Sequence, residues 1–384
     1  MSAKPITPQP STPSGSAEPD LAQMERVLKE QLDQADKNPR DVLWQLARLY
    51  QATKRPDQAL QCLRRILASE SDLEVKASCV LALGQTMEQC NDFPSAIRFY
   101  REAMAMEPIR NDTWYFIHNN LGYSYNQVGR FDEGERCCRS AIQINPSRPN
   151  GHKNLGIALA AQGKYREAAM SYITGTFNHA GDARSFKLLQ ELFKEHPELA
   201  FEFQSYLDRC EKSVRFAAVA LERARCGRPF KVLLGSADWE WLNLCGCTLN
   251  AISGGSVAIQ VFETLSQFIE AAGNGDFDLG FLTPGGFPTG SAGGTATDSW
   301  EQAVRAIRQI KSQKPIALVL VGTADELTQY EAAGRASAVD AMLQANQQIT
   351  NRMAGQGPVH IDFAEVDALV ETMIHLLTRG DDSV

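Results

Sequence analysis

A glycine-rich run at residues 284–297 of this 384-residue sequence is a candidate for binding a ligand. It follows Asp278–Leu282, a short apolar segment typical of a buried parallel strand. Parallel sheets bind ligands at the carboxyl ends of their strands, and glycine-rich backbone can present N–H groups to an anion. The run lacks the Gly-Lys-Ser/Thr of a phosphate-binding loop and the spacing of a dinucleotide fingerprint. A nucleotide or anion site here therefore stays an alternative to an ordinary surface loop.

Nine cysteines and six histidines could supply nucleophiles or metal ligands. Cys137 and Cys138 are adjacent, Cys245 and Cys247 lack a second pair, and neither arrangement has zinc spacing. No Ser-His-Asp or Cys-His arrangement can be read, so we expect no catalytic residue, metal or cofactor, and buried free thiols. The odd cysteine count and the lack of a signal peptide favour the reducing cytosol, which predicts a cytoplasmic location.

Charge is distributed unevenly along the chain. The net charge is -8, and residues 229–384 hold 8 Lys and Arg against 18 Asp and Glu. Nucleic-acid binding requires clustered Lys and Arg, so the acidic C-terminal part argues against a nucleic-acid partner. The sequence contains no run of 18 apolar residues, so no membrane span is expected.

An internal repeat lies between Asp41 and Ala180. Its helices are the first elements of the chain that could position a binding site. In each copy a small residue is followed twelve positions later by another, which predicts two antiparallel helices that cross closely. Pro108 and Pro146 are placed to end the second helices, because proline cannot continue a helix. The paired small residues are Gly84 and Ala96, Gly122 and Gly134, Gly156 and Ala168, with a weaker copy at Ala47 and Ala59.

This pattern resembles the tetratricopeptide repeat (TPR) family, in four consecutive copies. The resemblance implies an α-superhelix whose concave face, lined by the first helix of each repeat, binds an extended peptide or a helix of a protein partner. Each position on that face could instead be an ordinary solvated residue of a packing scaffold. By the family pattern, the exposed positions of this face are Trp44, Arg48, Gln85, Asn119, Tyr123, Asn126 and Lys153.

Two spacings exceed the 34 residues of the family. Ala47 to Gly84 is 37 residues and Gly84 to Gly122 is 38. We expect the extra residues between repeats, at Ser69–Asp72 and Ile109–Thr113.

Beyond Pro229 short apolar runs alternate with helical patterns, which predicts a doubly wound parallel sheet. The helical patterns are Asp238–Ile252, Thr264–Ala272, Asp298–Lys311, Asp325–Ala333 and Asp362–Leu377. The predicted strands are Lys231–Leu234, Val257–Phe262, Asp278–Leu282, Ile316–Val321 and Ala341–Leu343.

Four regions follow from these patterns. Helices at Leu21–Leu32 and Asp182–Lys194 are expected to cap the two ends of the repeats. The predicted regions are a disordered tail (1–19), a TPR superhelix with capping helices (20–196), a helical connector (197–228) and an α/β domain (229–384).

The α/β domain resembles a response-regulator receiver, a flavodoxin-like fold, most clearly at Trp300–Lys311 and Lys314–Val321. Receivers hold Mg²⁺ with an acidic pair after the first strand, whereas Ser236 and Ala237 stand there, with only Asp238 nearby. They accept phosphate on an aspartate after the third strand, where this sequence has Thr283.

Two further receiver positions complete the comparison. The hydroxyl position after the fourth strand corresponds to Thr323, and the lysine after the fifth strand is replaced by Gln344-Ala345-Asn346. Phosphoryl transfer needs an acceptor and charge neutralisation, so the resemblance implies a degenerate receiver that is not phosphorylated.

Together these patterns predict a non-catalytic adaptor or scaffold in a bacterial signalling or assembly complex. The repeat groove holds a protein partner, and the receiver-like domain supplies a second docking surface along its last helices or a homodimer contact. Two alternatives stay open: a phosphorelay protein with an unusual phosphoacceptor, and a nucleotide or anion binder that uses residues 284–297.

Overall fold

The computed structural model describes residues 21–34, 39–109, 111–236, 239–283, 305, 309–310, 316–322, 327–328, 331, 339–344 and 363–378. The predicted tail 1–19, the run 284–297, Asp238 and Thr323 lie outside these residues. The chain divides into two compact units, residues 1–175 with 188–196, and residues 176–187 with 197–384.

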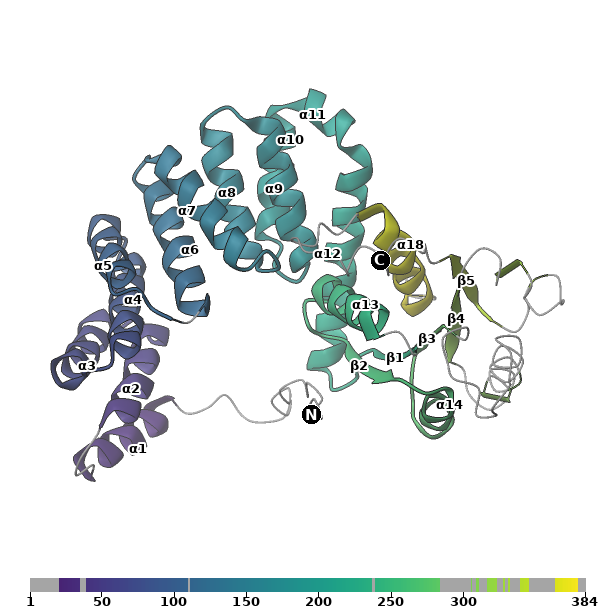
Figure 1. Ribbon diagram of the computed structural model, residues 1–384, viewed down its shortest axis with the longest axis horizontal. Coiled ribbons are helices and arrows are strands. Elements are labelled where there is room, and N and C mark those ends of the chain that lie inside the picture. Colours follow the sequence, from purple (N-terminus) through teal and green to yellow (C-terminus); the bar gives the residue numbers. More distant parts are fainter. Residues whose placement is uncertain are drawn as a thin grey trace. The chain divides into compact units, whose positions relative to one another are not determined.

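The first unit consists of antiparallel helix pairs (Figure 1). We call α2, α4, α6 and α8 the inner helices, since they are the first helices of their repeats, and α3, α5, α7 and α9 the outer helices. The helices, including α10, which ends in this unit, are α1 Leu21–Gln34, α2 Arg40–Ala52, α3 Pro56–Ser69, α4 Leu73–Gln89, α5 Phe93–Ala105, α6 Asn111–Gln127, α7 Phe131–Ile144, α8 Pro149–Ala161, α9 Tyr165–Asn178 and α10 Arg184–Glu195.

Each repeat turns between its two helices at the same position. Seven residues after the small residue of the inner helix, a residue adopts positive φ: Lys54 (55°), Asn91 (58°), Gly129 (77°) and Gly163 (77°). A left-handed residue ends a helix because its N–H can reach a carbonyl of the last turn. The turns therefore fix the antiparallel pairing that the small residues predict.

The close helix crossings are confirmed, and they are tighter than the spacing of small residues indicates. A Cβ added to Gly84 would lie 2.4 Å from the Tyr100 ring, and one added to Gly156 would lie 2.4 Å from the Tyr172 ring. Each glycine therefore faces a tyrosine sixteen residues ahead, rather than only the small residue twelve ahead. In the third repeat the facing residue is Cys138, 2.5 Å from a Cβ added to Gly122.

The extra residues are only partly where the sequence predicts them. α4 and α6 have 17 residues each, whereas α2 and α8 have 13. Asn111–Thr113 are the first turn of α6 and not part of a loop. The longer repeats thus extend their inner helices, because an added helical turn satisfies its own backbone hydrogen bonds.

The second unit contains a five-stranded, wholly parallel sheet in the order β2-β1-β3-β4-β5. Each of the five strands lies within one residue of its predicted bounds. The predicted helices 298–311 and 325–333 fall mostly outside the described residues. The elements are α11 Pro197–Glu202, α12 Gln204–Arg225, β1 Lys231–Gly235, α13 Trp239–Ile252, β2 Ala258–Phe262, α14 Leu265–Asn274, β3 Leu279–Leu282, β4 Ala317–Gly322, β5 Ala341–Gln344 and α18 Phe363–Leu377.

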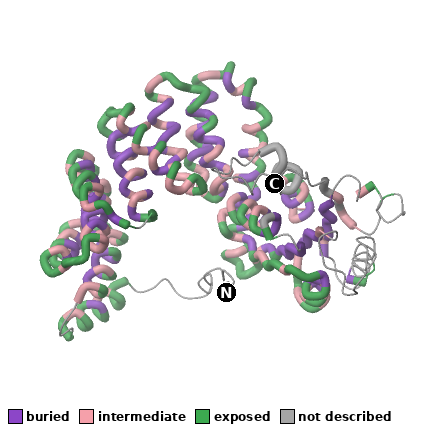
Figure 2. The backbone as a smooth tube through the Cα atoms, viewed as in Figure 1, coloured by how far each residue is buried: buried purple, intermediate pink, exposed green. Residues whose placement is uncertain are grey.

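Both faces of this sheet are covered. Val232 and Leu234 of β1 pack in one apolar cluster with α12, α13 and α18, and Leu233 packs in another with α14. Alternate residues of a strand point to opposite faces, and Figure 2 shows the central strands buried along their length. Helix α12 is part of the first cluster through Phe216 and Ala220.

All nine cysteines are free thiols, but the expectation that they are buried is wrong for three of them. Cys90, Cys226 and Cys247 are exposed, because each lies on the solvent side or at the end of a helix. Among the helices described, none is both long and apolar enough to cross a membrane.

Candidate functional site

A pocket of about 450 Å³ lies between the inner helices α2 and α4. It contains two of the residues predicted for the concave face, the partly buried Trp44 and the exposed Arg48. Spacing of four residues places both side chains on one face of α2. The remaining lining residues are Arg40, Asp41, Gln45, Asp72, Glu74, Val75 and Ser78.

Most charges of this pocket are already engaged. Arg40 lies 3.3 Å from both Asp41 and Glu70. Glu74 accepts hydrogen bonds from the Ile109 N–H at 2.6 Å and from the Thr113 hydroxyl at 2.8 Å. In the described part of the chain Arg48 forms no ion pair, so the pocket combines an indole surface with one cation available to a ligand.

Three other predicted residues lie on the inner helices α4, α6 and α8. Gln85, Tyr123 and Lys153 are each partly exposed. The Tyr123 ring meets the Phe93 ring edge-on at 5.9 Å, and Lys153 donates to the Asn150 side chain at 3.3 Å. Their exposure is compatible with the predicted face and does not test it.

Asn119 and Asn126 are not exposed, which corrects the prediction that they offer their amides to a partner. Both are 6% exposed. The Asn126 amide donates to the Asn154 carbonyl at 2.8 Å, and the Asn154 amide donates to the Asn119 side chain at 3.2 Å. Buried amides need hydrogen-bond partners. Here α8 accepts from the Asn126 amide and donates to the Asn119 oxygen, whereas the Asn126 Oδ1 has no hydrogen-bond partner among the described residues.

Asn126 belongs to a regular set of contacts that we call the polar ladder: Gln51, Glu88 and Asn126. Each lies four residues after the small residue of its inner helix and bonds the next inner helix. Gln51 donates to the Thr86 hydroxyl at 2.9 Å, and Glu88 accepts from the Ser124 hydroxyl at 2.8 Å. Reading the repeats for exposed positions missed this ladder, although its constant spacing is visible in the sequence.

Partial burial raises the pKa of Glu88 to about 7. The hydrogen bond from Ser124 lowers the same pKa by less than burial raises it. Desolvation disfavours the charged form of a carboxyl group. The pKa of Glu88 therefore lies above that of a fully exposed glutamate.

In the second unit the structure brings Ser236 and Thr283 together at the carboxyl ends of β1 and β3. The Thr283 hydroxyl donates to the Ser236 hydroxyl at 2.5 Å, and the Thr283 N–H donates to the Gly235 carbonyl at 2.9 Å. Ser236 is 1% exposed. The other two residues of the predicted degenerate site, Asp238 and Thr323, lie outside the described residues. Among the residues described, no three His, Cys, Asp or Glu side chains form a metal-binding group.

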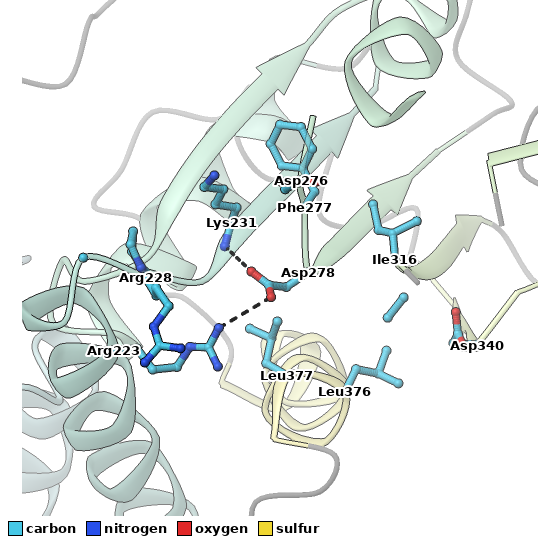
Figure 3. A pocket seen from close by; sticks show the side chains of 13 residues that line it. Arg223, Arg228, Lys231, Asp276, Phe277, Asp278, Ile316, Asp340, Leu376 and Leu377 are labelled. Carbon is cyan, nitrogen blue, oxygen red and sulfur yellow. Dashed lines mark hydrogen bonds and ion pairs between the residues drawn. The ribbon is translucent and has the colours of Figure 1, made fainter. Parts of the chain in front are cut away.

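The opposite, amino-terminal edge of the sheet holds a larger pocket of about 750 Å³ (Figure 3). Its apolar wall includes Ile316 together with Leu376 and Leu377 at the end of α18. Asp276 and Asp278 line it at the entrance of β3, where the sequence places them. Sequence reasoning gave this edge no binding role, because its lining residues come from five separate segments.

Two of the three acidic residues of this pocket accept hydrogen bonds from backbone N–H groups. Asp278 accepts from the Lys231 N–H at 2.7 Å and lies 3.7 Å from the Arg223 guanidinium. Asp340 accepts from the Leu318 N–H at 2.7 Å. Arg223 also lies 4.1 Å from the centre of the Phe230 ring. These contacts hold the first residues of β1, β3 and β4 in place. The apolar side chains of the pocket lie near the exposed side chains of Arg223, Arg228 and Lys231.

Two segments of the chain match family models described as tetratricopeptide repeat: residues 41–72 and 115–148. They cover α2–α3 and α6–α7. The chain therefore contains tetratricopeptide repeats, which confirms this part of the prediction. TPR proteins generally mediate protein–protein interactions, so a protein partner is indicated.

Three similar proteins share limited parts of the chain. Identity is 29% over 132 residues with small glutamine-rich tetratricopeptide repeat-containing protein 2 of Saccharomyces cerevisiae, covering 34% of this chain and 37% of that protein. Identity is 31% over 106 residues with the peroxisomal targeting signal receptor of Eremothecium gossypii, covering 28% of this chain and 18% of that protein. Identity is 25% over 97 residues with photosystem I assembly protein Ycf3 of Prochlorococcus marinus, covering 25% of this chain and 56% of that protein. Each match spans less than two thirds of the relative.

Two solved structures are similar at a distance. PilF of Pseudomonas aeruginosa is 19% identical with a TM-score of 0.42, covering 52% of this chain and 84% of that one. A crystal structure of MamA is 23% identical with a TM-score of 0.35, covering 41% and 88%.

Proposed function

We propose that this protein is a non-catalytic adaptor whose inner helices hold a segment of a protein partner. The observation that supports it best is the pocket between α2 and α4, where Trp44 shares one helix face with Arg48, which forms no ion pair among the described residues. Aromatic and arginine side chains dominate binding energy at protein interfaces. The names of two relatives, an assembly protein and a targeting-signal receptor, agree with this role.

The pocket indicates the chemistry of the partner. An aliphatic or aromatic side chain would pack on the Trp44 indole, and an acidic side chain would pair with Arg48. Gln85, Tyr123 and Lys153 extend the proposed face along the later repeats, with Lys153 offering a second cation. Asn119 and Asn126 take no part, because their amides join the repeats to one another.

Site-specific cross-linking tests this proposal. A photoreactive amino acid at Gln45, inside the pocket, should cross-link a partner in the source cells, whereas one at Arg64, exposed on the outer helix α3, should not. Titration of the cross-linked segment against variants then measures the contact. Trp44→Ala and Arg48→Glu should each weaken binding about 10-fold or more, and Arg64→Glu should not. Equal binding by all variants would exclude the pocket.

We infer that residues 229–384 form a flavodoxin-like, degenerate receiver domain. The strand order β2-β1-β3-β4-β5 supports this assignment, because it is the order of doubly wound folds of that type. The hydroxyls of Ser236 and Thr283 occupy the positions where receivers carry carboxylates. On this basis we propose the domain order given above, cytoplasmic action, and a role in a bacterial signalling or assembly complex; the pathway rests on fold analogy.

The pocket beside α18 is the proposed second docking surface. The partly exposed Leu377, backed by the buried Ile316 and Leu376, suits an aliphatic partner side chain, and the exposed Arg228 and Lys231 suit neighbouring acidic groups. A homodimer through this surface is the second candidate. Light scattering of Leu377→Asp decides between them: a dimer that becomes a monomer favours the homodimer, and a protein that is monomeric throughout favours a separate partner. The outward-facing Glu371→Gln is the control.

A further inference from the structure

The strand β2 forms one edge of the sheet (Figure 1). In the described part of the chain it pairs with β1 alone. The Ala258 N–H donates to the Phe230 carbonyl at 2.8 Å, and the Phe262 carbonyl accepts from the Ser236 N–H at 3.1 Å. These two bonds show which backbone groups of β2 face β1.

The backbone groups of Ile259 and Val261 face the other way. In a parallel ladder every second residue directs both its N–H and its C=O to the same neighbouring strand. Gln260 therefore bonds β1, as Ala258 and Phe262 do, while Ile259 and Val261 direct their groups to the open side. The side chains of Ala258, Gln260 and Val261 are exposed, so a further strand can reach this edge.

This edge lacks the features that commonly protect an edge strand from pairing, which are charged side chains, proline and bulges. Residues 250–262 contain no charged residue and no proline. The pairs from Lys231↔Ala258 to Gly235↔Phe262 follow one another without a bulge. Ile259 and Val261 are β-branched, which favours the strand conformation. The edge is therefore suited to accept another strand.

A second copy of β2 fits this edge, because the strand is complementary to itself. An antiparallel pair with a two-fold axis at Gln260 places Ile259 opposite Val261 of the second copy. Both residues direct their backbone groups outward, so each such pair can exchange two hydrogen bonds. The two Gln260 side chains meet at the axis, where each amide can donate to the other.

The charges around β2 also favour a second copy. A charged partner strand would find no counter-charge along residues 250–262, whereas a second copy needs none. Glu263, the first charged residue after β2, would lie opposite Val257. The two Glu263 carboxylates would then be about 20 Å apart along the strands, which exceeds the screening length of about 8 Å in physiological salt.

We propose that β2 joins two copies of this protein into a dimer with one continuous sheet, by antiparallel pairing about a two-fold axis at Gln260. This contact is separate from the proposed docking surface beside α18. Helix α18 contacts β3 and β5, whereas β2 lies at the other end of the strand order. The dimer does not depend on the proposed partner pocket between α2 and α4.

Amide hydrogen exchange of the full-length protein, resolved to single residues by electron-transfer fragmentation, tests this contact. A higher protein concentration should protect the N–H groups of Ile259 and Val261, which gain a partner only in the dimer. The N–H of Gln260 should be protected at every concentration, because it bonds β1. Over the same range, light scattering should show the mass rising from 42.3 kDa towards twice that value. A constant monomeric mass with both N–H groups unprotected would overturn the proposal.

A proline substitution removes one outward donor and keeps the bonds to β1. Proline is tolerated in an edge strand where its nitrogen faces solvent, so Val261→Pro should fold, which circular dichroism verifies. It should weaken dimerisation about tenfold or more, since both copies lose a hydrogen bond. Val261→Thr keeps the N–H and the β-branched shape and is the matched control. Equal dimerisation of the two variants would show that the edge is not the contact.

A charge exchange tests the register and needs no proline. Side chains directly opposite in an antiparallel pair have Cβ atoms about 5 Å apart. Gln260→Lys and Gln260→Glu should therefore each be monomeric alone, and a mixture of the two should form a dimer with one copy of each. Gln143→Lys, exposed on α7, should dimerise like the unchanged protein, and so should Leu377→Asp beside α18. Dimers of Gln260→Lys alone, or no dimer in the mixture, would overturn the two-fold pairing at Gln260 and leave the proposed docking surfaces unaffected.

Discussion

The hydroxyl of Thr283 donates a hydrogen bond to the hydroxyl of Ser236 across the carboxyl ends of β3 and β1. Neighbouring parallel strands place these two residues side by side, as the pairing of Gly235 with Leu282 requires. The two hydroxyls are uncharged, and one donates to the other, so their close contact needs no metal ion. Two carboxylates at this distance would repel each other and favour a bound cation.

The first prediction follows from this pair. Incubation of the protein with acetyl phosphate and Mg²⁺ should add no phosphate, because an acyl phosphate requires a carboxylate nucleophile. Intact-mass spectrometry before and after treatment with hydroxylamine measures this. A hydroxylamine-labile gain of one phosphate would instead support the phosphorelay alternative.

The second prediction concerns the glycine–tyrosine contacts of the repeats. Gly84→Ala should destabilise the protein by about 1–3 kcal/mol, because the new Cβ would lie 2.4 Å from the Tyr100 ring. In the first repeat Ala47 stands sixteen residues before Leu63, and both are buried. The double variant Gly84→Ala with Tyr100→Leu should therefore lose less stability than the sum of the two single variants.

Urea denaturation of the four proteins gives this coupling free energy. Gly273→Ala is a matched control, since a Cβ added there meets nothing within 4 Å. Simple additivity of the two changes would mean that the cost of Gly84→Ala does not come from the contact with the Tyr100 ring.

The sequence predicts the elements well and the polar contacts poorly, for a physical reason. Spacing of small and apolar residues reports which faces pack, so the repeats and the five strands are found with small errors in their bounds. Polar residues carry no comparable signal. Asn126 and Lys153 both look like exposed inner-helix residues, and only the position of the next helix decides that the first is buried.

The same limit applies to Glu88 and to the pocket beside α18. A glutamate near a helix end is usually solvated, and nothing local in the sequence shows that Glu88 is partly buried against Ser124 and Tyr100. The pocket draws Arg223, Asp278 and Leu376 from segments far apart in the chain, so only the folded sheet brings them together.

The third prediction concerns the N-terminal helix α1. Arg55 and then Lys29 hydrogen-bond Glu25 and hold its pKa at about 2. A lowered pKa means that the carboxylate contributes stability above pH 4.5, and that this contribution is lost as pH falls towards 2. Hydrogen exchange should therefore show α1 losing protection over this range, and Glu25→Gln should already lack that protection at pH 7.

Glu30→Gln on the same helix is the control, since Glu30 is exposed. If Glu25→Gln leaves the protection of α1 unchanged at pH 7, packing of Leu28 rather than the ion pairs holds the helix in place.

The last prediction concerns the helix α12, which the sequence alone presents as a connector. The Phe216 ring stacks on the Phe230 ring, with centroids 5.9 Å apart, and Phe216 and Ala220 are fully buried in the core that also contains β1 and α13. Removing a buried phenylalanine side chain costs about 3–5 kcal/mol. A fragment of residues 229–384 should consequently bind a hydrophobic dye and melt without cooperativity, while a fragment of residues 197–384 should unfold in one transition.

In the full-length chain, Phe216→Ala should lower the melting temperature of the second unit. The control is Arg215→Ala, which should not lower it, because the neighbouring Arg215 side chain is exposed. Cooperative unfolding of residues 229–384 alone would show that α12 is a true connector, because the sheet would then be complete without the ring that covers Phe230.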